Sequence, residues 1–465
     1  MSAAYSRLGI GLGLFAGLAI TAWVVWAPAE REARPNFVVI DIDTLRADRV
    51  FMRRDDGPLM PELTALAAGG TRFTTARSNA SWTLPALTTI LSGRHPPVAS
   101  DNRDSVAWIA PGDRLLPDIL GIYGYTTVAA WGGSFPSHFP PFSMPFGHIL
   151  PSDVGDPFPP VIEFLLDDPP EPFFLLVHNL DLHAPDGAFT REELHRFLPA
   201  GGPCGSLLDL TRLYKEMRDH LGDAVARDHV IGHYDAEVRR LDAWIGDVAA
   251  ALDDSGLDRR TVLIVTSNHG EELFEHGFMG HGIWHYENVI RVPLIVIDPA
   301  APAPGATVTT PVESIDLAPT ILARAGIEPE ADMEGASWLS LVGMSDSPYP
   351  ERDVFAVSTP WDASLQSGNR KLVRYGLDDP NDPVPPPRSG RVPLLSRNEL
   401  YDVAADPEER HDLAALEPDH LAALSARLDA LVAGSVASTR AMANPRLREF
   451  LQGHGYWEPA GDPKR

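Results

Sequence analysis

The sequence predicts an α/β protein with a parallel sheet. Short apolar runs rich in β-branched and aromatic residues recur along the chain, helical patterns separate them, and polar residues follow several of the runs. Such runs are typical of strands that are buried on both faces of a sheet. The expected strands are residues 37–40, 126–131, 173–178, 262–267 and 294–297.

The clearest helix precedes one of these strands. Its apolar residues recur every three or four positions and form one stripe along the helix: Tyr234, Val238, Leu241, Ile245, Val248 and Leu252. Gly256 is well placed to end the helix, and the run up to Ser267 follows directly. This helix–turn–strand order is the repeating unit of parallel sheets.

The first segment stands apart from this pattern. Residues 8–27 contain no charged side chain, and a helix of that length spans about 30 Å, the thickness of the hydrocarbon layer of a membrane. We therefore expect residues 1–34 to be a membrane anchor, with the rest of the chain outside the cytoplasm, on the periplasmic or extracellular side. A cleaved signal peptide is the alternative, because Ala27-Pro28-Ala29 resembles a cleavage site.

Composition excludes several classes of protein. The 465 residues include 38 Lys and Arg against 64 Asp and Glu, a net charge of −26, which argues against nucleic acid as a partner. An apolar content of 44% is too high for a disordered chain. The single cysteine, Cys204, rules out an internal disulfide and a cluster of cysteine metal ligands.

Polar residues follow three of the expected strands. Asp43, His178 and the pair Asn268-His269 all stand at carboxyl ends. In open parallel sheets, ligands bind beyond these ends. The recurrence predicts a site at one edge of the sheet.

A helix-forming segment runs from Ser81 to Arg94. Pro85 suits its first turn and Gly93 can end it, so Thr83 lies at the N-terminus. Free N–H groups and the helix dipole favour an anion there. A simple helix cap is the more common role of a threonine at this place. Spacing alone leaves both interpretations open.

Taken together, these segments resemble the sulfatase-like hydrolases of the alkaline phosphatase superfamily, from about Asn36 to Leu413. The matching motifs, in order, are residues 35–48, Thr83-x-Pro85 through Ser92-Gly93-Arg94, His178-x-x-Asp181-x-His183-x-Pro185, residues 266–293, and Glu399-Leu400-Tyr401-Asp402 with Asp406-Pro407. The resemblance implies a mostly parallel sheet sandwiched by helices in a catalytic domain of residues 35–345. A smaller α+β C-terminal subdomain would then occupy residues 346–465.

The resemblance also implies roles for individual residues. By analogy, Asp43, Asn268 and His269 hold one divalent metal ion, and residue type leaves Ca²⁺, Zn²⁺ and Mn²⁺ open. Thr83 is the nucleophile. The resemblance makes His183 and His281 contacts of the ester or proton donors to the leaving oxygen, and His178 and Asp181 substrate-binding residues.

Four positions depart from the family pattern. Sulfatases of the usual kind have Cys or Ser at the position of Thr83, converted to formylglycine, with Arg at the position of Leu87. Threonine cannot form that aldehyde, so no formylglycine is expected. Thr44 and Asn268 stand where the family often has Asp, which removes negative charge from the metal site. Asp41 compensates if strand alternation brings it to the same side as Asp43, or it is a loop carboxylate.

The sequence therefore predicts a metal-dependent hydrolase or transferase of sulfate or phosphate esters that uses Thr83 as a direct nucleophile. Its substrate would be an anionic ester on a lipid headgroup, a glycan or a small molecule. The alternative is a degenerate member of the family that binds an anionic ligand without turnover.

Overall fold

The structure is a computed structural model of the whole chain. Segments 8–27 and 184–195 and Cys204 lie outside the residues that it describes. The described residues are 34–96, 98–99, 114–132, 144–151, 156–183, 196–198, 224–277, 279–282, 284–358, 362–377 and 395–437. None of the helices within these ranges is long and apolar enough to cross a membrane.

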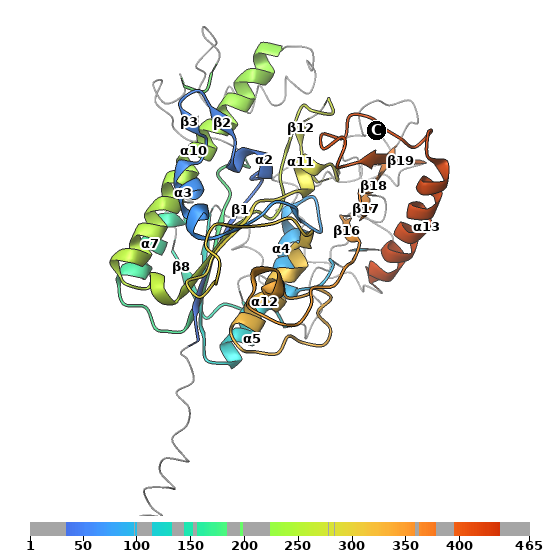
Figure 1. Ribbon diagram of the computed structural model, residues 1–465. Helices are drawn as coiled ribbons and strands as arrows, with labels where there is room; N and C mark the ends of the chain where they lie inside the picture. Colours follow the sequence, from blue (N-terminus) through green and yellow to red (C-terminus); the bar gives the residue numbers. More distant parts are fainter. Residues whose placement is uncertain are drawn as a thin grey trace, which may run out of the picture.

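An eight-stranded sheet forms the centre of the molecule (Figure 1). Its strands, in spatial order, are β14 (Ala306–Val308), β4 (Thr71–Phe73), β13 (Leu294–Ile297), β10 (Thr261–Thr266), β1 (Asn36–Ile42), β9 (Phe173–Asn179), β7 (Thr126–Trp131) and β8 (His148–Leu150). The five strands from β10 to β8 are parallel. All five predicted strands are present, and the predicted fold class is confirmed.

The strand β13 runs antiparallel to both of its neighbours, β10 and β4. Among its described residues, the connection from β10 to β13 contains only one short helix, α11 (Glu287–Ile290), beyond the carboxyl end of β10. A parallel crossover needs a helix that carries the chain back along the sheet. Without one, the chain returns directly and reverses its direction. The apolar run at 294–297 predicted a strand but carried no information about its direction.

Alternate residues of β1 enter different cores. Phe37 and Val39 pack with α4 (Thr83–Ser92), α5 (Leu116–Ile122) and α12 (Leu317–Arg324). Val38 and Ile40 pack on the opposite face with α3 (Pro61–Gly69), α7 (Phe158–Leu166) and α10 (Ala224–Asp254). Both faces of the strand are therefore buried, as its continuous apolar sequence predicted.

The predicted apolar stripe lies on α10, and all six of its residues are buried in the second core. Gly256 follows the helix with a φ of 69°, a left-handed conformation that glycine adopts without strain. Both predictions are confirmed. The remaining short elements are α2 (Ala47–Val50), β2 (Arg53–Arg54), β3 (Gly57–Pro58), β5 (Ala76–Arg77), β6 (Val98–Ala99), η2 (Asp258–Arg260), β11 (Glu272–Leu273), β12 (Met279–Gly280), β15 (Val312–Glu313), η3 (Ser314–Asp316), η4 (Leu339–Val342) and β20 (Val436–Ala437).

A separate antiparallel sheet follows towards the C-terminus. Its strands are β16 (Val354–Val357), β17 (Ala363–Ser367), β18 (Arg370–Leu377) and β19 (Leu395–Asp402), and α13 (Pro418–Ser435) packs on it around a core of its own. Figure 1 shows this sheet and α13 on the opposite side of the molecule from α7 and α10. We call β16–β19 with α13 the C-terminal sheet unit.

Candidate active site

The carboxyl ends of three neighbouring strands meet at one edge of the central sheet. Asp41 of β1 pairs with Thr266 of β10 on one side and with His178 of β9 on the other. The residues that follow β1 and β10, Asp43 and His269, are thereby brought together across more than 200 positions of sequence. The predicted gathering of polar residues at this edge is confirmed.

The loop after β10 passes very close to another backbone segment. A Cβ atom at Gly270 would lie 2.2 Å from the carbonyl oxygen of Asn288, and the Gly270 N–H donates to the carbonyl of Val289 at 2.6 Å. Only glycine permits this approach. The contact holds the loop that carries His269 against the segment around α11.

Three side chains form a compact triangle. The hydroxyl Oγ1 of Thr83 donates to Oδ2 of Asp43 at 3.0 Å and lies 3.3 Å from Nε2 of His269. The same Nε2 lies 3.1 Å from Oδ1 of Asp43. All three residues are completely buried. Thr83 begins α4 but makes no capping bond, since the N-cap residue is Trp82. The Thr83 hydroxyl therefore makes its contacts within the site and does not cap its own helix.

Two atoms of the triangle, Nε2 of His269 and Oδ1 of Asp43, face each other without a positive charge between them. Nδ1 of His269 lies 2.9 Å from the carbonyl of Gly270, so it carries the proton and leaves a lone pair on Nε2. That lone pair faces Oδ1 of Asp43, which makes no hydrogen bond. Burial acts to raise the pKa of Asp43, but positive charge on the neighbouring histidines, above all on His269, outweighs burial and lowers that pKa. Two buried lone-pair atoms 3.1 Å apart fit a bound cation.

The remaining donors would bring little negative charge to a cation bound here. Oδ1 of Asn268 accepts the N–H of His269 at 2.8 Å and keeps a second lone pair. Thr44, at a φ of 61°, turns its hydroxyl back to the carbonyl of Asp43 at 2.7 Å. Within the described ranges, no three His, Cys, Asp or Glu residues converge as metal ligands. Asp43, His269 and the Thr83 hydroxyl supply donors that fit a cation, and the Asn268 carbonyl is the next donor along the chain from His269.

Asp41 and His178 form a second layer behind Asp43. Nδ1 of His178 lies 2.7 Å from Oδ2 of Asp41, and its Nε2 lies 3.9 Å from Oδ2 of Asp43. Burial raises the pKa of Asp41, an effect that the contact with His178 only partly offsets. Asp41 lies within β1 and not in a loop. It contacts His178, which in turn lies near Asp43. His178 is completely buried, so its position suits orienting Asp43, and its substrate-binding role stays a prediction.

Asp181 lies on the turn after β9. Its carboxylate accepts from Nδ2 of Asn179 at 3.1 Å and from Arg240 at 3.3 Å. These contacts tie the turn to α10. The predicted role of Asp181 in substrate binding also stays a prediction.

Two further histidines lie against the triangle. The ring of His281 lies 4.4 Å from that of His269, and the ring of His183 lies 4.9 Å from that of His281, both measured between centroids. Burial and the neighbouring His281 lower the pKa of His183 to about 4, so its ring is neutral at neutral pH. The structure thus brings together Asp43, Thr83, His183, His269 and His281, as the resemblance implied.

Glu271 completes the arrangement and had no predicted role. Its two carboxylate oxygens lie 3.2 and 3.1 Å from Nδ1 of His281. Burial raises the pKa of Glu271 to about 7. Its place two residues after His269 was the available signal, but sequence alone does not show which way a loop carboxylate points.

Comparisons with known proteins find related sequences. The family model described as Sulfatase matches residues 35–327. Arylsulfatase K of Xenopus laevis is 27% identical over 210 residues, which are 43% of this chain and 36% of that protein. The chain thus spans about a third of the length of that relative.

Solved structures share the fold. The phosphonate monoester hydrolase of Agrobacterium radiobacter superposes with a TM-score of 0.64 at 18% identity, covering 88% of this chain and 97% of that one. A protein solved in complex with its substrate D-glucosamine-2-N,6-O-disulfate superposes with a TM-score of 0.61 at 19% identity, covering 88% and 100%.

Proposed function

The chain belongs to the sulfatase family, and from this premise we propose that it is a metal-dependent ester hydrolase whose nucleophile is Thr83. One observation carries the proposal. The Thr83 hydroxyl contacts Asp43 and His269 in a buried cluster instead of capping its own helix. A buried hydroxyl placed between a carboxylate and an imidazole at a helix N-terminus suits attack on an anionic ester.

Asp43, His269 and the Asn268 carbonyl would hold one divalent cation. When bound, the cation would lower the pKa of the Thr83 hydroxyl and neutralise charge on the transferring group. The oxygen and imidazole donors leave Ca²⁺, Zn²⁺ and Mn²⁺ open, and threonine requires no formylglycine.

The reaction would proceed in two displacements, the first by Thr83 and the second by water. Thr83 reacts as its alkoxide, with its proton released to solvent, because the low pKa of Asp43 makes that carboxylate a poor acceptor. Oγ1 bonds to the phosphorus or sulfur, the bond to the leaving oxygen breaks, and that oxygen takes a proton from His281. Water next attacks the same atom, its proton returns to His281, and the bond to Oγ1 breaks to restore the alkoxide.

His281 suits the proton transfer better than His183. Glu271 contacts Nδ1 of His281 and orients its ring, and Nε2 would be the nitrogen that transfers the proton. His183, whose pKa is lowered to about 4, is neutral at neutral pH and can donate a hydrogen bond to the ester.

We propose a phosphorus ester as the preferred substrate. A threonine intermediate on phosphorus is hydrolysed by attack at that atom, whereas the usual sulfatase route depends on the aldehyde that threonine cannot form. The similarity to a phosphonate monoester hydrolase supports this choice, and the similarity to arylsulfatase K keeps sulfate esters in the test. Lipid headgroups, glycans and small molecules are all open as carriers of the ester.

The test combines metal analysis with four aryl ester probes: a phosphate monoester, a phosphodiester, a phosphonate monoester and a sulfate. Thr83→Ala is compared with Thr89→Ala, a buried threonine of the same helix whose hydroxyl donates only to the carbonyl of Ala86. We expect Thr83→Ala alone to abolish turnover. Mass spectrometry of quenched wild-type protein should find the transferred group on Thr83. Equal activity of Thr83→Ala and wild type would contradict the assignment.

A degenerate, ligand-binding protein is the second candidate. The absence of a third acidic or histidine ligand within the described ranges favours it, since Asn268 and Thr44 supply no carboxylate. It predicts that inorganic phosphate or sulfate binds while no probe is turned over. Turnover that depends on Thr83 would rule it out.

We also propose that residues 8–27 anchor the protein in a membrane, with the catalytic domain on the periplasmic or extracellular side. Their uninterrupted apolar sequence supports this. An intact N-terminus on the membrane-bound protein would support the anchor, whereas a mature chain beginning after Ala29 would identify a cleaved signal peptide.

A further inference from the structure

The residue two positions before the nucleophile is held from two sides. The N–H of Ser81 donates to Oγ of Ser358 at 3.0 Å, and the carbonyl of Ser81 accepts the N–H of Gly282 at 2.8 Å. Ser358 directly follows β16 of the C-terminal sheet unit, and Gly282 directly follows His281. Ser81 therefore joins the segment leading to Thr83, the loop that carries His281 and the C-terminal sheet unit.

The hydroxyl of Ser358 uses all of its hydrogen-bonding capacity. Besides the Ser81 N–H, it contacts Oγ of Ser81 at 2.7 Å and Nε2 of His285 at 3.1 Å. A hydroxyl donates once and accepts twice. In either tautomer of His285, one of these two contacts takes the Ser358 proton and the other donates to its oxygen. Ser81, Ser358 and His285 are all buried, so no water replaces a lost partner without rearrangement.

Two more bonds attach the same segment to β16. The N–H of Val357 donates to the carbonyl of Asn79 at 2.8 Å, and Nδ2 of Asn79 donates to the carbonyl of Phe355 at 2.8 Å. These bonds fix Asn79, which is farther from Thr83. Both Ser358 and β16 contact the segment that leads to Thr83. Of these contacts, the one made by Ser358 is to the position nearest to Thr83 in sequence.

We propose that Ser358 is a positioning residue for the reaction at Thr83. Through the backbone of Ser81 it sets where the Thr83 hydroxyl lies relative to Asp43 and His269, and through the Gly282 contact it sets the His281 loop relative to both. This inference rests on the proposed function. Its physical basis is that a displacement of about 1 Å at a reacting atom can cost about 100-fold in rate.

The test compares three variants of the full chain on the aryl ester that the wild type turns over fastest. Ser358→Ala removes the three contacts of the hydroxyl and should lower kcat by about 10- to 100-fold while KM changes by less than about threefold. Ser358→Thr keeps the hydroxyl and should recover most of kcat. Ser364→Ala is the matched control, because its buried hydroxyl contacts His285 at 3.5 Å in the same network but not Ser81.

A readout that does not need turnover accompanies the kinetics. Hydrogen–deuterium exchange of the peptide covering residues 78–84 should increase in Ser358→Ala and stay unchanged in Ser364→Ala. Increased exchange without turnover in the wild type would contradict the proposed function and leave the structural part of the inference standing. Unchanged exchange, a kcat within twofold of wild type, or equal losses in Ser358→Ala and Ser364→Ala would overturn the inference.

Discussion

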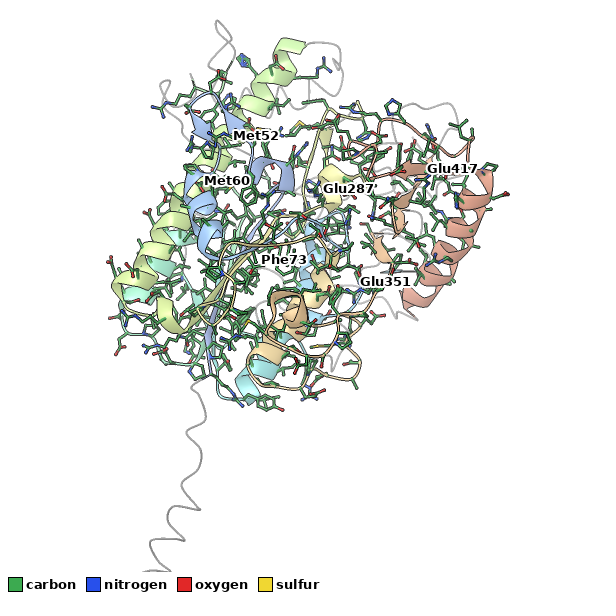
Figure 2. All side chains as sticks on the ribbon, viewed as in Figure 1. Met52, Met60, Phe73, Glu287, Glu351 and Glu417 are labelled. Carbon is green, nitrogen blue, oxygen red and sulfur yellow. The ribbon has the colours of Figure 1, made fainter. Side chains whose placement is uncertain are left out.

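Two buried polar clusters of this molecule differ in how their charges are balanced. In the triangle of Asp43, Thr83 and His269, Asp43 is completely buried, and the contacts of its carboxylate within the described residues are with Thr83 and histidines. Where the C-terminal sheet unit meets α11, Lys371 lies 3.0 Å from Glu287 and 2.8 Å from Glu409, and Arg77 bonds both oxygens of Glu287. Figure 2 shows Glu287 between the central sheet and this unit.

In the second cluster two cations face two carboxylates, so the buried charges are balanced, and we describe the cluster as closed. We call it the Lys371 cluster. The triangle is open, because Oδ1 of Asp43 faces a lone pair and makes no hydrogen bond. Burying a charge without compensation costs several kcal/mol, so a fold keeps such a site only where something else compensates it. The comparison teaches that incomplete charge balance, more than burial, distinguishes a site prepared for a ligand from a cluster that joins two parts of a fold.

The largest expected effect is on the closed cluster. Lys371→Met removes its central cation and leaves Glu287 and Glu409 partly uncompensated, so the free energy of unfolding should fall by about 3–5 kcal/mol. Adding Glu409→Gln should restore much of the loss, because the buried charges balance again. Chemical denaturation of the single and double variants measures both. A double variant no more stable than the single one would show that the cluster is not closed in this sense.

The open cluster should respond in the opposite way. At a pH where His269 is neutral, Asp43→Asn removes a carboxylate that no cation balances, so the metal-free protein should become more stable while turnover falls at least about 100-fold. Thermal unfolding in a chelator and steady-state kinetics measure the two effects. Asp41→Asn is the matched comparison, because Asp41 reaches Asp43 only through His178. It should weaken metal binding about 10- to 100-fold. A less stable metal-free Asp43→Asn would contradict the comparison.

A divalent cation should balance the charge of Asp43 in the triangle. Protons should compete with the cation for His269. Burial acts to lower the pKa of His269, but Asp43 outweighs burial and raises it in the metal-free protein. The folded protein therefore takes up a proton where the cation would bind, and metal affinity should fall about tenfold per pH unit below that pKa. Titration calorimetry at several pH values measures this. An affinity that is independent of pH would show that His269 is not a ligand.

The smallest expected effect concerns His285, which contacts Ser358 and Ser364. Burial and the nearby Lys371 lower its pKa to about 3, below the value of 6.5 that it has in the unfolded chain. The unfolded chain then binds a proton that the folded one does not, so stability is full above pH 6.5 and declines as the pH falls towards 3. His285→Gln should flatten this decline in denaturant midpoints between pH 7 and 4.5. The exposed His148→Gln should leave the decline unchanged.

The sequence predicted those parts of the fold that depend on local periodicity. The apolar runs of β1 and β10 and the stripe of α10 needed no knowledge of the partners they pack against. The direction of β13 was not predictable in this way, because it depends on how the chain returns from the site and not on residues 294–297.

The candidate site required contacts between distant residues. Position at the start of α4 alone favours a cap, and it is the contacts of Thr83 with Asp43 and His269, 40 and 186 residues away, that favour a nucleophile. The resemblance to a family supplied those partners. It did not supply Glu271 or Ser358, since the direction of a loop side chain follows from packing that no local pattern records.

The strand β1 separates the two ends of the catalytic domain. Asn36 stands at its start and Asp43 just past its end, about 23 Å apart at the usual rise of a strand. If the chain is anchored through residues 8–27, the reaction centre faces the aqueous space on the far side of the domain from its own bilayer. Esters that diffuse in from solution or hang from extended polymers would then reach Thr83, whereas headgroups of the anchoring leaflet would remain a strand's length away.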